Sequence, residues 1–483
     1  MILKKRELVL LVLLTFIVGL VGAYTGLKIF QPNVAKPNTQ APFQSSISNY
    51  DEDYLNTIKK AYDLINQHYI EDIDEQQLLE GAIQGMLETL EDPYSSYMNA
   101  DAMERFNEQI QSSFEGIGAE VSMVDGKVTI VAPIKNSPAE KAGLRPNDQI
   151  LKVDDEDLEG LDLNEAVEKI RGEKGSKVVL LIQRQGTSEP FEVTITRDEI
   201  PIETVYASTE NVDGKKTGII EITTFSETTA DEFNKAISKL EKDGIEGLVI
   251  DVRGNPGGLL DSIEEILQQF IPKDIPYLQI EDGNGKVEKF YTKLDKKKPY
   301  PISVLIDEGS ASASEILAVA MKEVGYDVVG MTSFGKGTVQ QAVPLGEKEE
   351  GTIKLTFYKW LSPKGNWINE KGVEPTIEQK QPEFYYANPI KVEEPFKIDQ
   401  TDENIKNAQI MLQGIGYDPK RTDGYFDQNT MEAIMRFQQE HGLTANGELN
   451  SETAYAIESK VLDIIRNGEQ DLQLEKALET LYE

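Results

Sequence analysis

Apolar residues recur with two different periods in the first half of this chain, and each period predicts a different kind of element. From Tyr54 to Ile110 they return every three or four positions, which predicts a helical arm. From Phe114 to Arg197 they alternate with polar residues in short runs, which predicts strands. The runs are IGAEVSMV, KVTIVAPI, QILKVDD and KVVLLIQRQ, and the short helices SPAEKAGLRPND and LNEAVEKIRG lie between them.

From Gly218 onward, continuous apolar strands alternate with amphipathic helices. The strands are GIIEITTF, GLVIDVRG, PISVLID and DVVGM, and the helices are ADEFNKAISKLEKDG, LLDSIEEILQQFI and ASEILAVAMKEV. This alternation predicts an α/β layer whose parallel sheet is covered on both faces. Functional groups of such sheets gather at the carboxyl ends of the strands, where the segments NPGG and GSASASE fall.

The last third of the chain ends in a separate helical module. After the linker from Gln381 to Pro395, glycine turns separate three short helices between Thr401 and Asn467. Beyond Asn467 the chain is polar and acidic, and we expect a frayed helix there. His441 is interpreted as a surface residue at a helix end.

The N-terminus carries an uncharged run of 20 residues, Leu8 to Leu27, which is long enough to cross a bilayer as a helix. Lys4, Lys5 and Arg6 precede it, which predicts a cytoplasmic N-terminus and an extracytoplasmic body. Because the run is longer than the apolar part of a secretory signal, an uncleaved signal anchor is favoured over cleavage near Gly22 or Ala23. A tether rich in Pro, Asn, Gln and Ser follows.

Composition narrows the possible chemistry. The chain has 49 basic and 84 acidic residues, a net charge of −35, which argues against a nucleic-acid partner. It has no cysteine and two histidines, which excludes a cysteine nucleophile and disfavours a Ser-His-Asp site. Neither a GxxxxGK[ST] loop nor an HExxH helix is present, so no nucleotide, metal or other cofactor is implied.

The segment GSASASEILAVAMKEV, followed by SFGKGTVQ, indicates a Ser/Lys hydrolase site. Ser312 opens an apolar helix, and Lys336 follows 24 positions later between two glycines. To act as a base, this lysine needs enough desolvation to lower its pKa from about 10.4. Gln340 could orient it through the side-chain amide oxygen. The alternative is structural: Ser312 and Glu315 fit a capping box, and Lys336 would be an exposed turn residue.

Backbone amides near Ser312 are candidates for an oxyanion hole. A nucleophile at a helix N-terminus has main-chain N–H groups beside it, and the amide of Ala313 is the natural first donor. The second donor is expected from Gly257 or Gly258 in the segment RGNPGG, where no side chain covers the backbone.

The segment from Phe114 to Arg197 resembles a PDZ domain of the bacterial type, on its order of strands and helices. Such domains add a peptide to an exposed strand edge and capture its terminal carboxylate on loop amides. The loop here is Gly116, Ile117, Gly118 and Ala119. Arg171 ends the predicted groove helix and is either a cation at a helix C-terminus, the favoured interpretation, or a link between peptide binding and the catalytic module.

The PDZ-like segment, NPGG, SASASE and FGKGTVQ occur in the order found in carboxyl-terminal processing proteases, also called tail-specific proteases, which the chain resembles from Tyr54 to Ile377. The resemblance implies a crotonase-like core, a Ser312/Lys336 dyad assisted by Gln340, structural roles for Ser310 and Ser314, and a homodimer formed through the helical arms. The interval from serine to lysine is one residue shorter than the family suggests, with the gap placed near Gly325.

The C-terminal module resembles the small peptidoglycan-binding type 1 domain through its LQxxGY, DGxF and AIxxFQ elements. It would bind peptidoglycan or serve dimer contacts. The whole fold is therefore predicted as multidomain α/β. The predicted parts are 1–31 stub and anchor, 32–50 linker, 51–112 helical arm, 113–198 PDZ domain, 199–395 Ser/Lys protease core, 396–466 peptidoglycan-binding-like domain and 467–483 acidic tail.

These patterns together predict a membrane-anchored, extracytoplasmic serine endopeptidase that captures protein C-termini in its PDZ domain. Two rivals stay open at this point. An acyl-CoA enzyme would share the core but needs catalytic acids near NPGG and cytoplasmic CoA. A non-catalytic adaptor would use the PDZ and wall-binding modules to tether client proteins.

Overall fold

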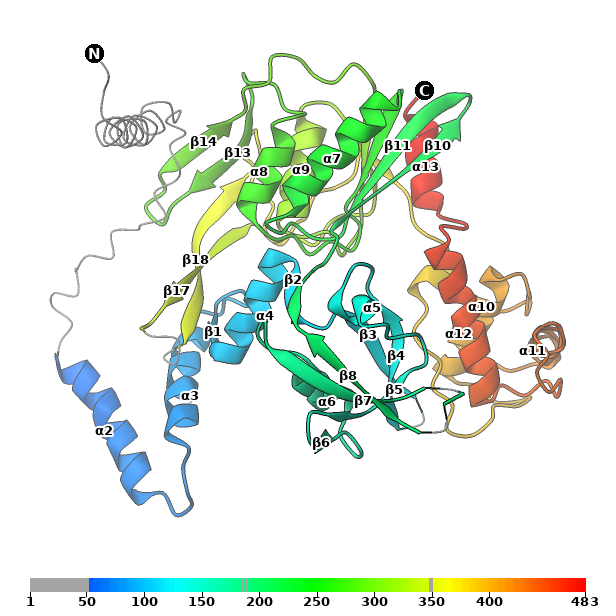
Figure 1. The fold of residues 1–483 in the computed structure, drawn as a ribbon. Helices are drawn as coiled ribbons and strands as arrows, with labels where there is room; N and C mark the ends of the chain where they lie inside the picture. Colours follow the sequence, from blue (N-terminus) through cyan, green and yellow to red (C-terminus); the bar gives the residue numbers. More distant parts are fainter. Residues whose placement is uncertain (1–51, 125, 185, 188, 347–350) are drawn as a thin grey trace, which may run out of the picture. The chain divides into compact units, whose positions relative to one another are not determined.

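The computed structural model describes residues 52–124, 126–184, 186–187, 189–346 and 351–483 (Figure 1). They belong to two compact units that divide between Gly81 and Ala82, and each unit is described by itself. The expected anchor from Leu8 to Leu27 and the tether after it lie outside the described residues. Within the described ranges, no helix is long and apolar enough to cross a membrane.

The first unit contains helix α2 (Glu52–His68) and the start of helix α3 (Glu75–Glu88). The Asn66 amide donates to the Glu75 carboxylate at 3.0 Å, which joins the two helices across their connecting loop. The large apolar side chains of α2 lie exposed; they include Tyr54, Leu55, Ile58, Leu64 and Ile65. The helical arm expected from the apolar spacing is therefore present.

The second unit begins within α3 and continues through helix α4 (Ala100–Gln111) into the predicted strands. A sheet in the order β3, β4, β5, β7, β8 surrounds a closed apolar core with helices α5 (Pro138–Lys141) and α6 (Leu163–Ile170). The strands are Ala119–Val124, Lys127–Pro133, Gln149–Val153, Lys177–Gln183 and Phe191–Thr196, and β6 (Glu156–Asp157) pairs with β5. Strand β3 is an edge of this sheet, so one side of its backbone is open to a further strand.

Two further short strands, β2 (Ser113–Gly116) and β9 (Asp198–Pro201), pair antiparallel beside this sheet. They lie at the two chain ends of the PDZ-like segment. Their pairing fixes where the chain enters and leaves that segment, so the segment is closed on itself as a domain.

The α/β core is a six-stranded sheet in the order β10, β11, β12, β15, β16, β19. The strands are Val205–Val212, Lys215–Ile222, Gly247–Asp251, Ile302–Ile306, Asp327–Gly330 and Ile377–Glu378. All neighbours pair parallel except β10 with β11. The central strands β12 and β15 are buried at every position, as expected for strands covered on both faces.

Different helices cover the two faces of this sheet. Helices α7 (Thr229–Lys242), α8 (Leu260–Leu267) and α9 (Ala313–Glu323) share one large apolar core with it. Helix α13 (Leu472–Thr480) packs on the other face through Ala477 and Leu478. The expectation of a frayed helix beyond Asn467 is therefore corrected, because residues 472–480 form the ordered helix α13 (Figure 1). Its Ala477 and Leu478 pack in the apolar core on the second face of the sheet.

A second sheet, in the order β1, β18, β13, β14 with β17 on β18, was not expected from the sequence patterns. Its strands are Ser96–Met98, Thr352–Leu361, Pro276–Glu281, Val287–Tyr291 and Thr338–Pro344. This sheet places β1, which lies between α3 and α4 within the helical arm, beside β18, and β17 with Gln340 pairs with the same strand β18.

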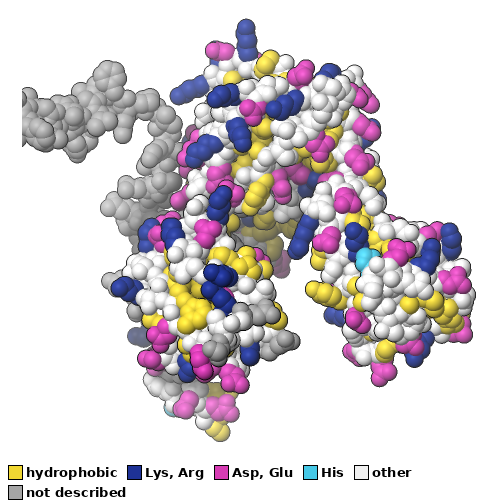
Figure 2. Space-filling view, turned by 45° about the vertical axis from the view of Figure 1, so that its right-hand side comes forward, with side chains coloured by type: hydrophobic (Ala, Val, Ile, Leu, Met, Phe, Trp, Pro, Cys, Tyr) yellow, Lys and Arg dark blue, Asp and Glu magenta, His cyan; other side chains and the backbone are white. Residues whose placement is uncertain are grey.

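The C-terminal domain has helices α10 (Glu403–Gly414), α11 (Gln428–Glu440) and α12 (Ser451–Arg466) around its own apolar core. The linker before it contributes the 3₁₀ turn Glu383–Tyr386, whose Phe384 is buried in that core. His441 ends α11 and stacks on Phe437 at 4.2 Å between ring centroids. On the face drawn in Figure 2, acidic and basic side chains are interspersed rather than segregated.

Candidate active site

The segment from Ser310 to Ser314 connects β15 to α9, and its three serines have different surroundings. The Ser310 hydroxyl donates to the carbonyl of Val252 at 2.8 Å, and the Ser314 hydroxyl donates to the carbonyl of Asn255 at 2.9 Å. Both serines are fully buried, whereas Ser312 is partly accessible. The hydroxyls of the outer two serines are therefore committed to structure, whereas among the described residues no carbonyl holds the proton of the Ser312 hydroxyl.

The backbone of Ser312 adopts an unusual conformation, with φ 55° and ψ −111°. A residue with a side chain in such a region costs roughly 1–3 kcal/mol unless its surroundings hold it there. Its N–H donates to the Glu315 carboxylate at 2.8 Å, which supplies that restraint. The strained turn places the Ser312 side chain at the first turn of α9, where the amide of Ala313 has no partner among the described residues.

Glu315 is fully buried and accepts four hydrogen bonds. Its Oε1 accepts from the Ser333 hydroxyl and the Gly335 amide, both at 2.6 Å. Its Oε2 accepts from the amides of Ser312 and Lys336, both at 2.8 Å. The expected capping role of Glu315 is therefore one half of a larger arrangement that fixes the serine turn against the lysine loop.

Both tryptophans of the chain hold the backbone of that lysine loop. The indole of Trp360 donates to the carbonyl of Lys336 at 2.9 Å, and that of Trp367 donates to the carbonyl of Gly337 at 2.8 Å. A β-carbon added at Gly337 would lie 2.7 Å from the Trp367 indole nitrogen. The loop is thus closely packed, as the flanking glycines predicted.

The side chain of Lys336 is largely buried, and this burial lowers the pKa of its ammonium below the ordinary lysine value. The positive charge of Lys354 lowers the pKa further, whereas Asp92 and Glu315 act in the opposite direction. The Nζ atom lies 4.9 Å from the ring centroid of Tyr94. In the part of the chain that the structure describes, no hydrogen bond joins it to the Ser312 hydroxyl.

Gln340 lies on β17, opposite Thr356 of β18. Its side-chain nitrogen donates to the hydroxyls of Thr338 at 2.8 Å and Thr356 at 3.0 Å. The structure thus brings Gln340 into the same sheet edge as the lysine loop, but in this conformation its amide is engaged by the two threonines and not by Lys336.

Of the three main-chain amides predicted as oxyanion donors, one already donates a hydrogen bond in this structure and two do not. The amide of Gly257 donates to the side-chain oxygen of Asn255 at 2.8 Å, so it is occupied in this conformation. Among the described residues, the amides of Gly258 and Ala313 have no hydrogen-bond partner. A β-carbon at Gly257 would lie 2.8 Å from the Ser312 β-carbon, which shows how closely this loop approaches the serine.

The PDZ loop has the shape that its glycines predict. Gly118 has φ +73°, and an added β-carbon would lie 2.5 Å from Ser137. Ile117 is buried in the domain core, Gly116 ends β2, and Ala119 begins the edge strand β3.

Arg171 ends α6 and contacts the helical arm. Its guanidinium donates to both carboxylate oxygens of Glu108 on α4, at 3.0 and 2.9 Å, and lies 5.0 Å from the ring centroid of Phe114. Helix α4 in turn reaches the core, where the Glu227 amide donates to the Ile110 carbonyl at 2.8 Å. Arg171 therefore contacts the helical arm as well as ending α6. The favoured interpretation as a cation at a helix end did not include this contact.

The sequence patterns did not identify Asn255, Tyr94 or the two tryptophans as site residues. Asn255 is buried, and its side chain bridges the carbonyl of Ile222 and the amide of Gly257. Its place directly after a buried strand is the signal that could have singled it out. Tyr94 lies 242 positions before Lys336 in the chain, and no local pattern connects them.

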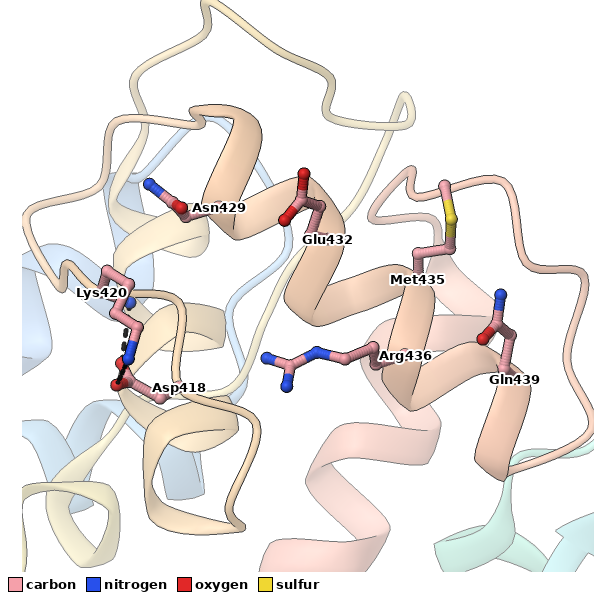
Figure 3. A pocket seen from close by; sticks show the side chains of 7 residues that line it. All are labelled: Asp418, Lys420, Asn429, Glu432, Met435, Arg436 and Gln439. Atoms are coloured by element: carbon pink, nitrogen blue, oxygen red, sulfur yellow. Dashed lines mark hydrogen bonds and ion pairs between the residues drawn. The ribbon is translucent and has the colours of Figure 1, made fainter.

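A separate hollow lies on the C-terminal domain between α11 and the loop that carries Asp418 and Lys420 (Figure 3). Its polar lining includes Asn429 and Arg436 of α11. Lys420 pairs with Asp418 at 2.7 Å, whereas Arg436 extends into the hollow and makes no ion pair among the described residues. The hollow shares no residue with the region around Ser312.

Four family models match this chain. Peptidase family S41 matches residues 216–379, and a PDZ domain model matches residues 129–184. A model of the N-terminal domain of the activating protease CtpB matches residues 16–102, and a peptidoglycan binding domain model matches residues 401–457.

Similar proteins of known name cover almost the whole chain. The carboxy-terminal processing protease CtpB of Bacillus subtilis is 51% identical over 96% of both chains. Its CtpA counterpart from the same organism is 40% identical over 91% of this chain and 92% of its own. Among solved structures, a photosystem II D1 C-terminal processing protease matches 69% of this chain and 94% of its own with 26% identity and a TM-score of 0.41.

Proposed function

Because this chain belongs to peptidase family S41 and is a carboxy-terminal processing serine peptidase with a PDZ domain, we propose that Ser312 is its nucleophile and Lys336 its general base. The observation that carries this assignment is the contrast among the three serines. The hydroxyls of Ser310 and Ser314 donate hydrogen bonds to buried carbonyls. Of the three serines, only Ser312 is partly accessible, and it lies beside amides without a partner.

The chemistry follows from these groups. Neutral Lys336 removes the proton of the Ser312 hydroxyl as its oxygen attacks the scissile carbonyl carbon. The developing oxyanion accepts hydrogen bonds from the amides of Ala313 and Gly258. Collapse of the tetrahedral intermediate breaks the C–N bond, and the lysine ammonium protonates the leaving amine. The neutral lysine then deprotonates a water that attacks the acyl carbon. The ester C–O bond breaks, and the lysine ammonium returns the proton to the Ser312 oxygen as the acid product leaves.

In this conformation the two residues are not yet hydrogen-bonded, so the proposal includes a rearrangement before catalysis. Lys336 has to leave the Tyr94 ring and reach the Ser312 hydroxyl, and Gln340 has to exchange a threonine partner for the lysine. Catalytic hydrogen bonds in enzymes without substrate are often unformed and tighten on binding. Because Glu315 already holds the backbones of Ser312 and Lys336, only the side chains have to move, which is a smaller change than a movement of the main chain.

We also propose that the PDZ domain captures the C-terminus of a protein substrate. The edge strand β3 would accept the peptide as a further strand, and the amides of Gly116, Ile117, Gly118 and Ala119 would bind its carboxylate. Arg171 would transmit occupancy to α4 through Glu108, because it bonds both carboxylate oxygens of that residue.

The location, assembly and partners of the peptidase are proposed from the sequence and from separate features of the structure. The apolar run from Leu8 to Leu27 supports a membrane-anchored protein with an extracytoplasmic body in a bacterial cell envelope. The exposed apolar face of α2 supports a homodimer formed through the helical arms. The hollow around Arg436 supports a contact with peptidoglycan, and the layered α/β sheet supports a crotonase-like core.

Cleavage of a peptide with a free C-terminus tests the assignment. A soluble chain without residues 1–31 is compared with its Ser312→Ala and Lys336→Ala variants, and Ser208→Ala and Lys289→Ala change exposed residues of the same types as controls. We expect cleavage in the wild type and both controls and a loss of at least about 10³-fold in the two site variants. Cleavage that persists in either site variant would refute the dyad.

A further inference from the structure

We propose that Tyr94 is a positioning residue that docks the Lys336 ammonium away from Ser312, and that residues 92–95 join this docking to Gln340. These four residues, Asp92, Pro93, Tyr94 and Ser95, are named the 92–95 turn. The inference rests on the proposed roles of Ser312 and Lys336 and adds a residue that holds the base in its resting place.

The contact between the two side chains is direct. Lys336 Nζ lies 4.9 Å from the centroid of the Tyr94 ring, within the range of a cation–π interaction. Burial raises the pKa of the Tyr94 phenol, and nearby acids add to that effect, so the ring stays neutral at the pH of an assay. The partner that the ring attracts is the ammonium and not the neutral amine.

The 92–95 turn is fixed internally by Asp92. Its Oδ1 accepts from the Tyr94 amide at 3.1 Å, and its Oδ2 accepts from the Ser95 hydroxyl at 2.6 Å. These bonds hold the backbone that carries the ring, so the ring has a defined place rather than being a surface side chain that happens to lie near the lysine.

The turn is also fixed to the sheet that carries Gln340. The amide of Thr356 donates to the Ser95 hydroxyl at 3.1 Å, and strand β1 directly after the turn pairs Ser96 with Lys354. The hydroxyl of the same Thr356 accepts from the Gln340 amide at 3.0 Å. One threonine therefore contacts both the turn that docks the lysine and the glutamine expected to assist it.

These contacts connect Gln340 to Tyr94 through a chain of hydrogen bonds that does not include Ser312. It runs from Gln340 to Thr356, from Thr356 to Ser95, and through Asp92 to Tyr94 and the lysine. With the turn in place, Lys336 and Gln340 both have partners other than each other. Release of the lysine from the ring is then a step that precedes assembly of the catalytic site.

The docking depends on protonation, so it predicts a specific effect on the pH profile. The charged groups that face Lys336 are Asp92 of the turn, Glu315 of α9 and Lys354 of β18, and none of them changes when Tyr94 is replaced. Tyr94→Leu removes the ring but keeps an apolar side chain, so the ammonium loses its partner. The rising limb of kcat/KM should then move to lower pH by about 0.5 to 1 unit.

The experiment measures kcat/KM for a tail peptide against pH in the wild type, Tyr94→Phe, Tyr94→Leu and the control Tyr291→Leu, which alters an exposed tyrosine on β14. On the acidic side of the limb we expect Tyr94→Leu to be about three- to tenfold faster than the wild type, with equal rates on the plateau. Tyr94→Phe keeps the ring and should match the wild type, as should Tyr291→Leu.

Three results would overturn the inference: an unmoved limb in Tyr94→Leu, an equal loss of activity at every pH, or a Tyr94→Phe profile that follows Tyr94→Leu. If Tyr94→Leu does not fold, Tyr94→Met serves as the ring-free variant, because methionine fills irregular apolar space. Lys336→Met separates this failure from that of the proposed function. If Lys336→Met cleaves normally, both fail, whereas an inactive Lys336→Met with an unmoved limb refutes only the role of Tyr94.

Discussion

The main-chain amides of Ser312 and Lys336 donate to the same oxygen atom, Oε2 of Glu315, at 2.8 Å each. The two residues come from the start of a helix and from a loop 24 positions later, so their separation is not set by any local structure. A buried carboxylate that accepts charge-assisted hydrogen bonds is a strong and directional anchor. It sets the distance between the two backbones while leaving both side chains free to move.

Replacement of Glu315 by glutamine should therefore lower kcat more than it changes KM. A glutamine supplies one acceptor oxygen and places an NH₂ group against two of the four donors, which are then left unpaired. We expect kcat to fall by about 10- to 100-fold, measured with a tail peptide, and the exposed Glu246→Gln to have no effect. Normal turnover in Glu315→Gln would show that the anchor is dispensable.

Gly254 and Gly258 of the segment RGNPGG should respond differently to alanine. At Gly258 an added β-carbon would lie 2.0 Å from the carbonyl oxygen of Phe225, whereas at Gly254 nothing lies within 4 Å. Both have positive φ, 63° at Gly254 and 145° at Gly258, and a residue with a side chain is more strained at the second value, by about 1–3 kcal/mol. Steady-state kinetics should show at least about 100-fold lower kcat for Gly258→Ala and only a small change for Gly254→Ala. Equal losses in the two variants would contradict the placement of the Gly258 amide in the oxyanion hole.

Neutralising Lys354 should move the pH profile in the direction opposite to the change at Tyr94. Its charge lowers the pKa of Lys336, so Lys354→Met raises that pKa and a higher pH is needed to form the neutral base. The rising limb of kcat/KM should shift to higher pH with an unchanged plateau, and the exposed Lys289→Met should leave it in place. A limb that stays fixed, or moves to lower pH, would mean that it does not report Lys336.

The contact between Arg171 and Glu108 should matter most for substrates that occupy the PDZ domain. Both side chains are partly exposed, so the pair adds little to stability, and Arg171→Ala should unfold at nearly the wild-type temperature. We expect it to lower kcat/KM for a peptide with a free C-terminus more than for the same peptide with an amidated end. The double variant with Glu108→Ala should lose no more than the single one, because coupled residues are not additive. Additive losses would place the two residues on separate paths.

The sequence predicted the parts of this protein that depend on local patterns. The period of apolar residues located the helical arm, the PDZ strands and the alternating strands and helices of the core. The choice of Ser312 among three serines agrees with the hydrogen bonds of its neighbours. The arm, the strands and the alternation follow from the spacing of neighbouring residues, whereas the choice of Ser312 came with the family resemblance.

What the sequence did not predict arises from contacts between distant segments. Asp471 looks like part of an acidic tail, yet it caps α13 and pairs with the buried Arg253 at 2.7 Å, which fastens that helix to the core. The sheet of β17 and β18 brings Gln340 beside Thr356 rather than beside Lys336. The sequence does not distinguish Gly257 from Gly258 as donors, whereas in the structure the side chain of Asn255 occupies the Gly257 amide.

Covalent labelling tests the Ser312/Lys336 dyad most directly. A fluorophosphonate added to the soluble protein over a range of pH, followed by mass mapping of the modified peptide, reports which serine is nucleophilic and which group activates it. The dyad predicts a phosphonylated Ser312 in the wild type, with a rate that rises with pH, and labelling lost in Lys336→Met. Labelling of Ser310 or Ser314, or equal labelling of Ser312 in Lys336→Met, would contradict it.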